Sequence, residues 1–108
     1  SGNDDQVLPI MSLGGKGVIS VFSNILPAQM HKITSLWMSG NHEESRRLFL
    51  SWYDLMKGLF VDVNPIPVKE ALNWLGYQCG ECRLPLTNMN ESCTSQLRSI
   101  MRRHHLIG

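Results

Sequence analysis

The hydrophobic positions of the first half of the chain include one short, nearly continuous run, from Val18 to Phe22. Most of its residues are β-branched or aromatic, and glycines precede it. Such a run is typical of a strand that is buried on both faces. The pattern therefore predicts a strand over Gly17–Val21 in the middle of a parallel sheet, with a neighbouring strand on each side.

No other segment has a comparable strand pattern. A single buried strand leaves its N–H and C=O groups without partners, at a cost of about 1–3 kcal/mol for each group. We therefore expect the chain to be part of a larger fold. Its missing strands would come from residues outside this sequence or from another chain.

The segments on either side of this strand have helical features. The first helix is expected over about Gln6–Leu13, with Asp4 or Asp5 as its cap. The second is expected over about Ile25–Met38, with Asn24 as its cap. The order helix, strand, helix predicts an α/β fold.

After Gly40 the pattern is helical throughout. A long helix is expected over about 41–61, because its apolar residues recur at intervals of three and four and form one stripe. Two further helices are expected over about Val68–Leu75 and Glu91–His104, the latter capped by Asn90. The stripe consists of Leu48, Trp52, Leu55, Met56 and Leu59. We interpret it as core or as a subunit contact.

Composition and charge narrow the class of protein. The 108 residues are 43% hydrophobic, which is enough for a packed core and too much for a disordered chain. With 10 basic and 9 acidic residues the net charge is +1, which indicates neither a nucleic acid nor a membrane surface as a partner. No apolar run approaches the roughly 20 residues of a membrane span.

The polar N-terminus and the cysteine count bear on the compartment of the protein and on the start of the chain. The N-terminus is polar and acidic, unlike a signal peptide, and the odd number of cysteines, 3, fits a reducing cytoplasm. The chain begins with Ser1 and not with Met. We therefore expect that it was processed or cut, or that it starts within a longer protein.

Three groups of residues are candidates for chemistry. Cys79 and Cys82 form a Cys-x-x-Cys motif. A zinc site built on this motif would need two more ligands. Cys93, His104 and His105 are the available candidates for a metal. A redox role remains a second alternative, and incidental thiols are the interpretation that we favour.

Lys16, on a glycine turn, is a candidate amine nucleophile, although a turn lysine is usually a solvated surface residue.

The glycines Gly14, Gly15 and Gly17 precede the predicted strand. Phosphate-binding glycine loops follow a strand, so neither the dinucleotide nor the nucleoside-triphosphate pattern fits. A tight turn into the strand is the better interpretation. For Asp4 and Asp5, helix capping is favoured over a role near a site, because adjacent acids rarely share one proton.

Four segments, in this order and at this spacing, together resemble the C-terminal portion of the dihydrodipicolinate synthase family of bacteria. The resemblance covers essentially the whole chain. The segments are Ser1–Asp5, Gly14–Asn24, Asn64–Lys69 and Arg83–Leu86.

The resemblance implies a (β/α)8 TIM barrel with an appended helical region. Residues 1–40 would then be the end of the barrel, comprising the seventh loop and helix and the eighth strand and helix. Residues 41–108 would be the C-terminal helical region. The fold class expected for the chain is therefore α/β, the C-terminal part of a TIM barrel with an α-helical appendage, and its first partner is the remainder of the barrel.

The resemblance also implies an activity for the full protein. Family members are lyases of the class I aldolase type, which condense pyruvate with aspartate semialdehyde through a lysine Schiff base, towards lysine and diaminopimelate. The Schiff-base lysine lies on an earlier strand, so no catalytic residue is expected in this chain, and the chain alone should be inactive. No cofactor and no metal are expected. The family implies a homotetramer in the cytoplasm.

The resemblance places four residues around the family's substrate site, two of them by a direct match and two by the loop in which they lie. Ile19 matches the residue at the end of the eighth strand that lines the pyruvate site, and Gly2 matches a glycine beside the second substrate. Asp4 and Asp5 lie in the same loop as Gly2. Two alternatives stay open: a non-catalytic helical interaction module, and one half of a split aldolase.

Overall fold

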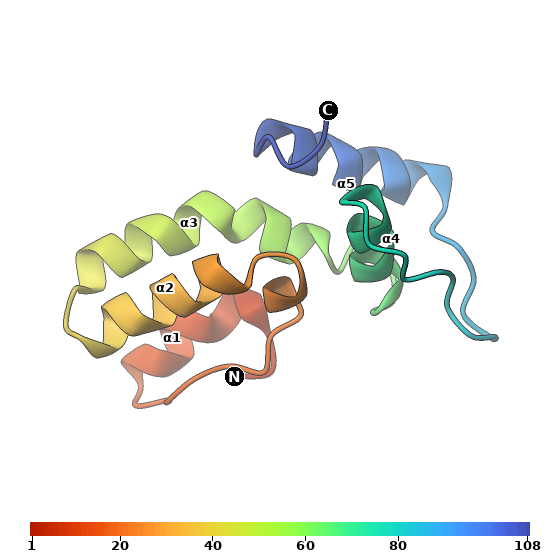
Figure 1. Cartoon of the computed structure of the whole chain (residues 1–108). Coiled ribbons are helices and arrows are strands. Elements are labelled where there is room, and N and C mark those ends of the chain that lie inside the picture. Colours follow the sequence, from red (N-terminus) through yellow and green to blue (C-terminus); the bar gives the residue numbers. More distant parts are fainter. The chain divides into compact units, whose positions relative to one another are not determined.

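The computed structural model describes all 108 residues and contains helices only (Figure 1). Two short 3-10 helices and five α-helices follow one another along the chain. Their bounds are η1 Asp4–Gln6, α1 Val7–Ser12, η2 Phe22–Asn24, α2 Pro27–Met38, α3 His42–Gly58, α4 Ile66–Trp74 and α5 Glu91–Arg103.

The chain divides into two compact units, Ser1–Met56 and Lys57–Gly108. The first unit contains η1, α1, η2, α2 and most of α3, and the second contains the end of α3 with α4 and α5. The boundary expected at residue 40, between the end of a barrel and an appended region, refers to a longer protein and stays a prediction.

The α/β fold class expected from the sequence is wrong for this chain. The structure contains no strand, and residues 15–20 are extended without regular secondary structure. Apart from the turn bond from the Gly15 N–H to the Ile10 carbonyl, only Ser1 forms backbone hydrogen bonds with this segment, to Gly17 and to Ile19. A strand requires a ladder of such bonds along a neighbouring segment. Because one residue makes no ladder, the apolar run alone does not produce a strand.

Most of the helices lie where the periodicity predicts them, and their ends follow from local chemistry. The predicted stop at Gly40 is confirmed, since Gly40 adopts φ +91° and ends α2. The cap predicted at Asn90 is also confirmed, because its side chain accepts a hydrogen bond of 2.8 Å from the Cys93 N–H. The cap predicted at Asn24 is wrong: Asn24 belongs to η2, and α2 begins three residues later at Pro27, which suits a first helical position.

The first unit has a core formed by one face of each of its helices. Buried Ser45 links α3 to α2, because its hydroxyl donates a hydrogen bond of 2.6 Å to the Ile33 carbonyl. At the turn between these helices the rings of Trp37 and His42 stack with their centroids 4.0 Å apart. The buried apolar residues of this unit are Val7, Leu8, Met11, Phe22, Ile25, Met30, Ile33, Phe49, Leu55 and Met56.

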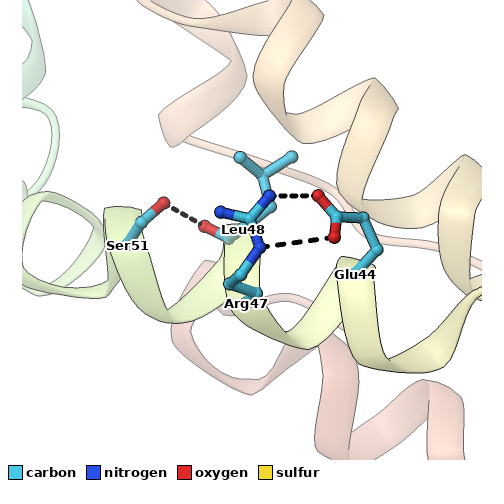
Figure 2. Close-up of polar contacts among 4 residues, drawn as sticks. All are labelled: Glu44, Arg47, Leu48 and Ser51. Carbon is cyan, nitrogen blue, oxygen red and sulfur yellow. Dashed lines mark hydrogen bonds and ion pairs between the residues drawn. The ribbon is translucent and has the colours of Figure 1, made fainter.

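The outer face of α3 is polar, and Figure 2 shows two of its contacts. Arg47 donates to both carboxylate oxygens of Glu44, one turn earlier in the helix, and the Ser51 hydroxyl donates to the Leu48 carbonyl. The hydrogen bond from Arg47 lowers the pKa of Glu44 below its ordinary value, and the same pair raises the pKa of Arg47. Both side chains are exposed, so solvent screens the pair and its contribution to stability is small.

The second unit packs α4 against α5 around a smaller core. The guanidinium of Arg98 lies 4.7 Å from the ring centre of Trp74, a cation–π contact between these two helices. The segment after α4 is fastened to that helix, because Asn73 hydrogen-bonds Cys79 and Gly80. The buried apolar residues of this unit are Leu59, Ile66, Val68, Ala71, Met89, Leu97, Ile100 and Met101.

Candidate functional site

The four candidate site residues lie in two segments that the structure brings together, residues 1–5 and 16–22. The Ser1 nitrogen donates to the Gly17 carbonyl at 2.9 Å, and the Ile19 N–H donates to the Ser1 carbonyl at 2.8 Å. Segments that are 16 to 18 residues apart in the sequence therefore run side by side through direct backbone contact.

Gly2 and Ile19 are the exposed members of this set. The Ile19 side chain is 86% exposed, although its type and the apolar run around it predict burial. Gly2 follows Ser1 directly and is also exposed, and a Cβ atom added to it would meet no other atom within 4 Å. Both positions are therefore open to a molecule that approaches this part of the surface.

Asp4 has a different environment, because it is only 1% exposed. Its carboxylate accepts hydrogen bonds of 3.0 Å from the N–H groups of Val21 and Phe22, and a further one from the Ser20 hydroxyl. The capping of the first helix predicted for Asp4 or Asp5 is wrong, since α1 has no side-chain cap. Asp4 instead binds the free N–H groups at the start of η2.

The role of Ser20 could not be found from the sequence. Its hydroxyl donates to Asp4 and accepts a hydrogen bond of 2.9 Å from the Ser23 N–H, while the Ser23 hydroxyl donates to the Ser20 carbonyl. The carboxylate and the hydroxyl are 16 residues apart, so no helical or strand spacing relates them. Only the tertiary contact between the two segments reveals the network.

The cavity nearest to these residues measures about 440 Å³ and lies between the extended segment and α2. Its lining includes Lys16, Val18 and Ser20 on one side and Met30, His31 and Met38 on the other. Ile19 does not line it, and neither do Gly2, Asp4 or Asp5. This cavity is therefore not formed by the four candidate site residues.

Comparison with models of protein families matches residues 1–104 to the Dihydrodipicolinate synthetase family. The chain belongs to this family. The resemblance inferred from its four segments is thereby confirmed, and it extends over nearly the whole sequence.

Individual members of the family are similar along the same length. The 4-hydroxy-tetrahydrodipicolinate synthase of Acetivibrio thermocellus is 50% identical over 107 residues, which are 99% of this chain. The crystal structure of the dihydrodipicolinate synthase of Thermotoga maritima matches 99% of this chain with a TM-score of 0.94 and 45% identity. That of the chloride-inhibited enzyme of Acinetobacter baumannii, complexed with pyruvate, matches 99% with a TM-score of 0.89 and 33% identity.

The chain spans only part of these relatives. It covers 37% of the length of the Acetivibrio synthase, 36% of the Thermotoga structure and 37% of the Acinetobacter structure. The family relationship is therefore shown for this chain, whereas the activity of a whole synthase involves residues beyond it.

The remaining candidates for chemistry do not form a site in this member of the family. Lys16, Lys32 and Lys57 are exposed, and Lys69 donates a hydrogen bond of 2.8 Å to the Glu81 carbonyl. Cys79, Cys82 and Cys93 are free thiols, and no three His, Cys, Asp or Glu side chains come together as metal ligands. None of the helices combines the length and the apolar character that a membrane crossing requires.

Proposed function

We propose that this chain is the C-terminal part of a 4-hydroxy-tetrahydrodipicolinate synthase, a lyase of lysine and diaminopimelate biosynthesis. The observation that carries this proposal is the 50% identity over 107 residues to a synthase of that name. The match covers 99% of this chain, so it includes both segments of the candidate site.

The proposed reaction uses covalent catalysis by an amine. A lysine of the longer protein, outside these 108 residues, condenses with the ketone of pyruvate to give a Schiff base and water. The methyl group of the bound pyruvate then loses a proton to give an enamine, whose carbon adds to the aldehyde carbon of aspartate semialdehyde while the aldehyde oxygen takes up a proton. Hydrolysis of the imine releases the product and restores the lysine amine. Lys16, Lys32 and Lys57 are exposed surface residues, which supports a catalytic lysine elsewhere in the protein.

Within this chain, we assign the walls of the substrate site to the exposed positions of the two paired segments. Ile19 borders pyruvate with its backbone and exposed side chain, and Gly2 borders aspartate semialdehyde. Asp5, which is partly exposed in the same loop as Gly2, lies at the edge of the site. The hydrogen bonds between Ser1 and the segment of Ile19 support this arrangement, because they hold the two walls side by side.

The same proposal covers the assembly and location of the enzyme. It is a cytoplasmic homotetramer that requires no cofactor, and the rest of the longer protein is the first partner of this chain. Three free cysteines are in keeping with a reducing compartment.

The test is to trap the Schiff base. The longer protein that contains this chain is incubated with pyruvate and borohydride, which reduces the imine to a stable adduct, and its peptides are mapped by mass spectrometry. We expect one adduct per protein, on a lysine outside residues 1–108, together with turnover of aspartate semialdehyde. Absence of any adduct, or a stoichiometric adduct on one of the four lysines of this chain, would contradict the proposal.

A further inference from the structure

Asp4 is a buried carboxylate that makes all of its hydrogen bonds with one distant segment. Val21 N–H and Phe22 N–H donate to one of its oxygens, each at 3.0 Å, and the Ser20 hydroxyl donates to the other. All three donors are uncharged. Burying a carboxylate is costly unless hydrogen bonds replace its water, and bonds to an ionised acceptor are stronger than neutral ones. The carboxylate therefore holds this segment firmly.

The position of these donors explains why the segment needs an acid. Val21 and Phe22 stand at the start of η2, where the first N–H groups have no partner within the helix. Phe22 is fully buried, so water does not reach its N–H group. Asp4 acts as the cap of η2, and it comes from a segment 17 residues earlier than the first amide it binds.

The network continues from Asp4 into the chain that follows Ile19. The Ser20 hydroxyl also accepts a hydrogen bond of 2.9 Å from the Ser23 N–H. Ser23 is therefore linked to the Asp4 carboxylate through the Ser20 hydroxyl. Ile19 precedes Ser20 directly, and its own N–H is held by the Ser1 carbonyl at 2.8 Å. Because the Ile19 side chain is 86% exposed, packing does not fix its place. The hydrogen bonds on either side of it do.

We propose that Asp4 is a positioning residue for the pyruvate site: it does not touch substrate, but it fixes the backbone of Ser20–Phe22 and so places Ile19. This rests on the proposed function, in which Ile19 borders pyruvate. The role assigned to Asp4 thus differs from that of Asp5 and Gly2, which are exposed to substrate.

The test compares Asp4→Ala, Asp4→Asn and Ser20→Ala in the longer protein. Asp4→Ala removes every bond of the network and is expected to raise the KM for pyruvate about 10- to 100-fold, since displacements near 1 Å have effects of this size. The KM for aspartate semialdehyde should change less than about threefold. Asparagine keeps an oxygen for the two amides and offers its NH2 group to the hydroxyl, so Asp4→Asn should restore the pyruvate KM to within about threefold of wild type.

Ser20→Ala removes one bond of the three and should raise the pyruvate KM by about 3- to 10-fold. Asp62→Asn makes an acid-to-amide change at a position remote in sequence, where the carboxylate binds only the adjacent Val63 N–H, and should alter no kinetic constant. An Asp4→Ala protein with a lowered Tm and unchanged constants for pyruvate would overturn the proposal. If Asp4→Ala does not fold, an unchanged pyruvate KM in Ser20→Ala overturns it instead.

Amide hydrogen exchange supplies a measurement that is independent of turnover. Exchange at Val21 and Phe22 should be at least about tenfold faster in Asp4→Ala, or in Ser20→Ala if the former does not fold. Equal exchange in variant and wild type would overturn the proposal that Asp4 fixes this backbone segment. A wild-type protein that neither traps pyruvate nor turns over substrate would count against the proposed function. Faster exchange in the variant would then show that Asp4 fixes this backbone segment, but not that the segment serves catalysis.

Discussion

At the scale of single residues, chemistry in this chain depends on backbone groups more than on reactive side chains. Ile19 is held through its N–H group and Gly17 through its carbonyl, both by Ser1. The acid that orders the neighbouring turn, Asp4, is buried and fully hydrogen-bonded. In the proposed site, these residues would therefore supply walls and no nucleophile.

The proposed place of Gly2 beside the second substrate leads to a prediction at this scale. Gly2→Ala should leave folding unchanged, because the added Cβ meets no atom of the chain within 4 Å. If aspartate semialdehyde occupies that space, its KM should rise by about tenfold or more while the pyruvate KM changes little. Steady-state kinetics with each substrate varied in turn measures both constants in the longer protein.

Gly17→Ala is the matched control, since a Cβ atom there also meets nothing within 4 Å. It should leave both KM values and the Tm near those of wild type. A Gly2→Ala enzyme with wild-type constants for aspartate semialdehyde would remove Gly2 from the substrate site.

At the scale of elements, the helices are stabilised by a few specific polar contacts in addition to their apolar faces. α2 and α3 are joined by the bond from buried Ser45 to the Ile33 carbonyl, and α5 begins at the Asn90 cap. The start of α2 shows how such contacts compete. Asn24 suits a cap, but its side chain donates to the carbonyl of Val21, the residue just before η2, and Pro27 then begins α2.

Ser45→Ala tests the contact between α2 and α3. The hydroxyl is fully buried and its bond to the Ile33 carbonyl measures 2.6 Å, so its loss should lower the free energy of unfolding by about 0.5–1.5 kcal/mol. Ser51→Ala is the control on the same helix, because the Ser51 hydroxyl is exposed and bonds only within α3 (Figure 2). It should change stability by less than about 0.5 kcal/mol. Urea unfolding of the longer protein gives both values. Equal losses of unfolding free energy in the two variants would show that the bond between the helices stabilises no more than the bond within α3.

At the scale of the whole molecule, the chain exposes eight large apolar side chains. Ile19 and Leu84 are each 86% exposed, and Leu13 is 89% exposed. Further exposed apolar residues occur in both units: Met38, Leu50, Phe60, Val63 and Tyr77. Where such side chains lie together in a contiguous patch, the patch is usually covered by a partner.

We therefore expect the 108-residue chain, prepared alone, to associate or to bind an apolar dye strongly. Sedimentation velocity over a hundredfold range of concentration should show an increasing average mass. The longer protein, measured in the same way, should give one stable oligomer whose mass does not change with concentration. A monomeric chain with a sharp, cooperative thermal transition and no dye binding would contradict this expectation.

The family resemblance, the presence of the five α-helices and a few of their ends could be predicted from the amino-acid sequence. The periodicity of apolar residues predicts α3 and α5. The cap at Asn90 and the stop at Gly40 are predictable too, because they depend on residues within one or two turns of the helix end. The sequence did not determine whether the apolar run around Ile19 forms a strand. That depends on neighbours for backbone pairing, and in this chain Ser1 alone provides them. The tertiary structure also decided the partner of Asp4, since a buried carboxylate binds whichever free N–H groups the fold brings to it, and these lie 17 and 18 residues away.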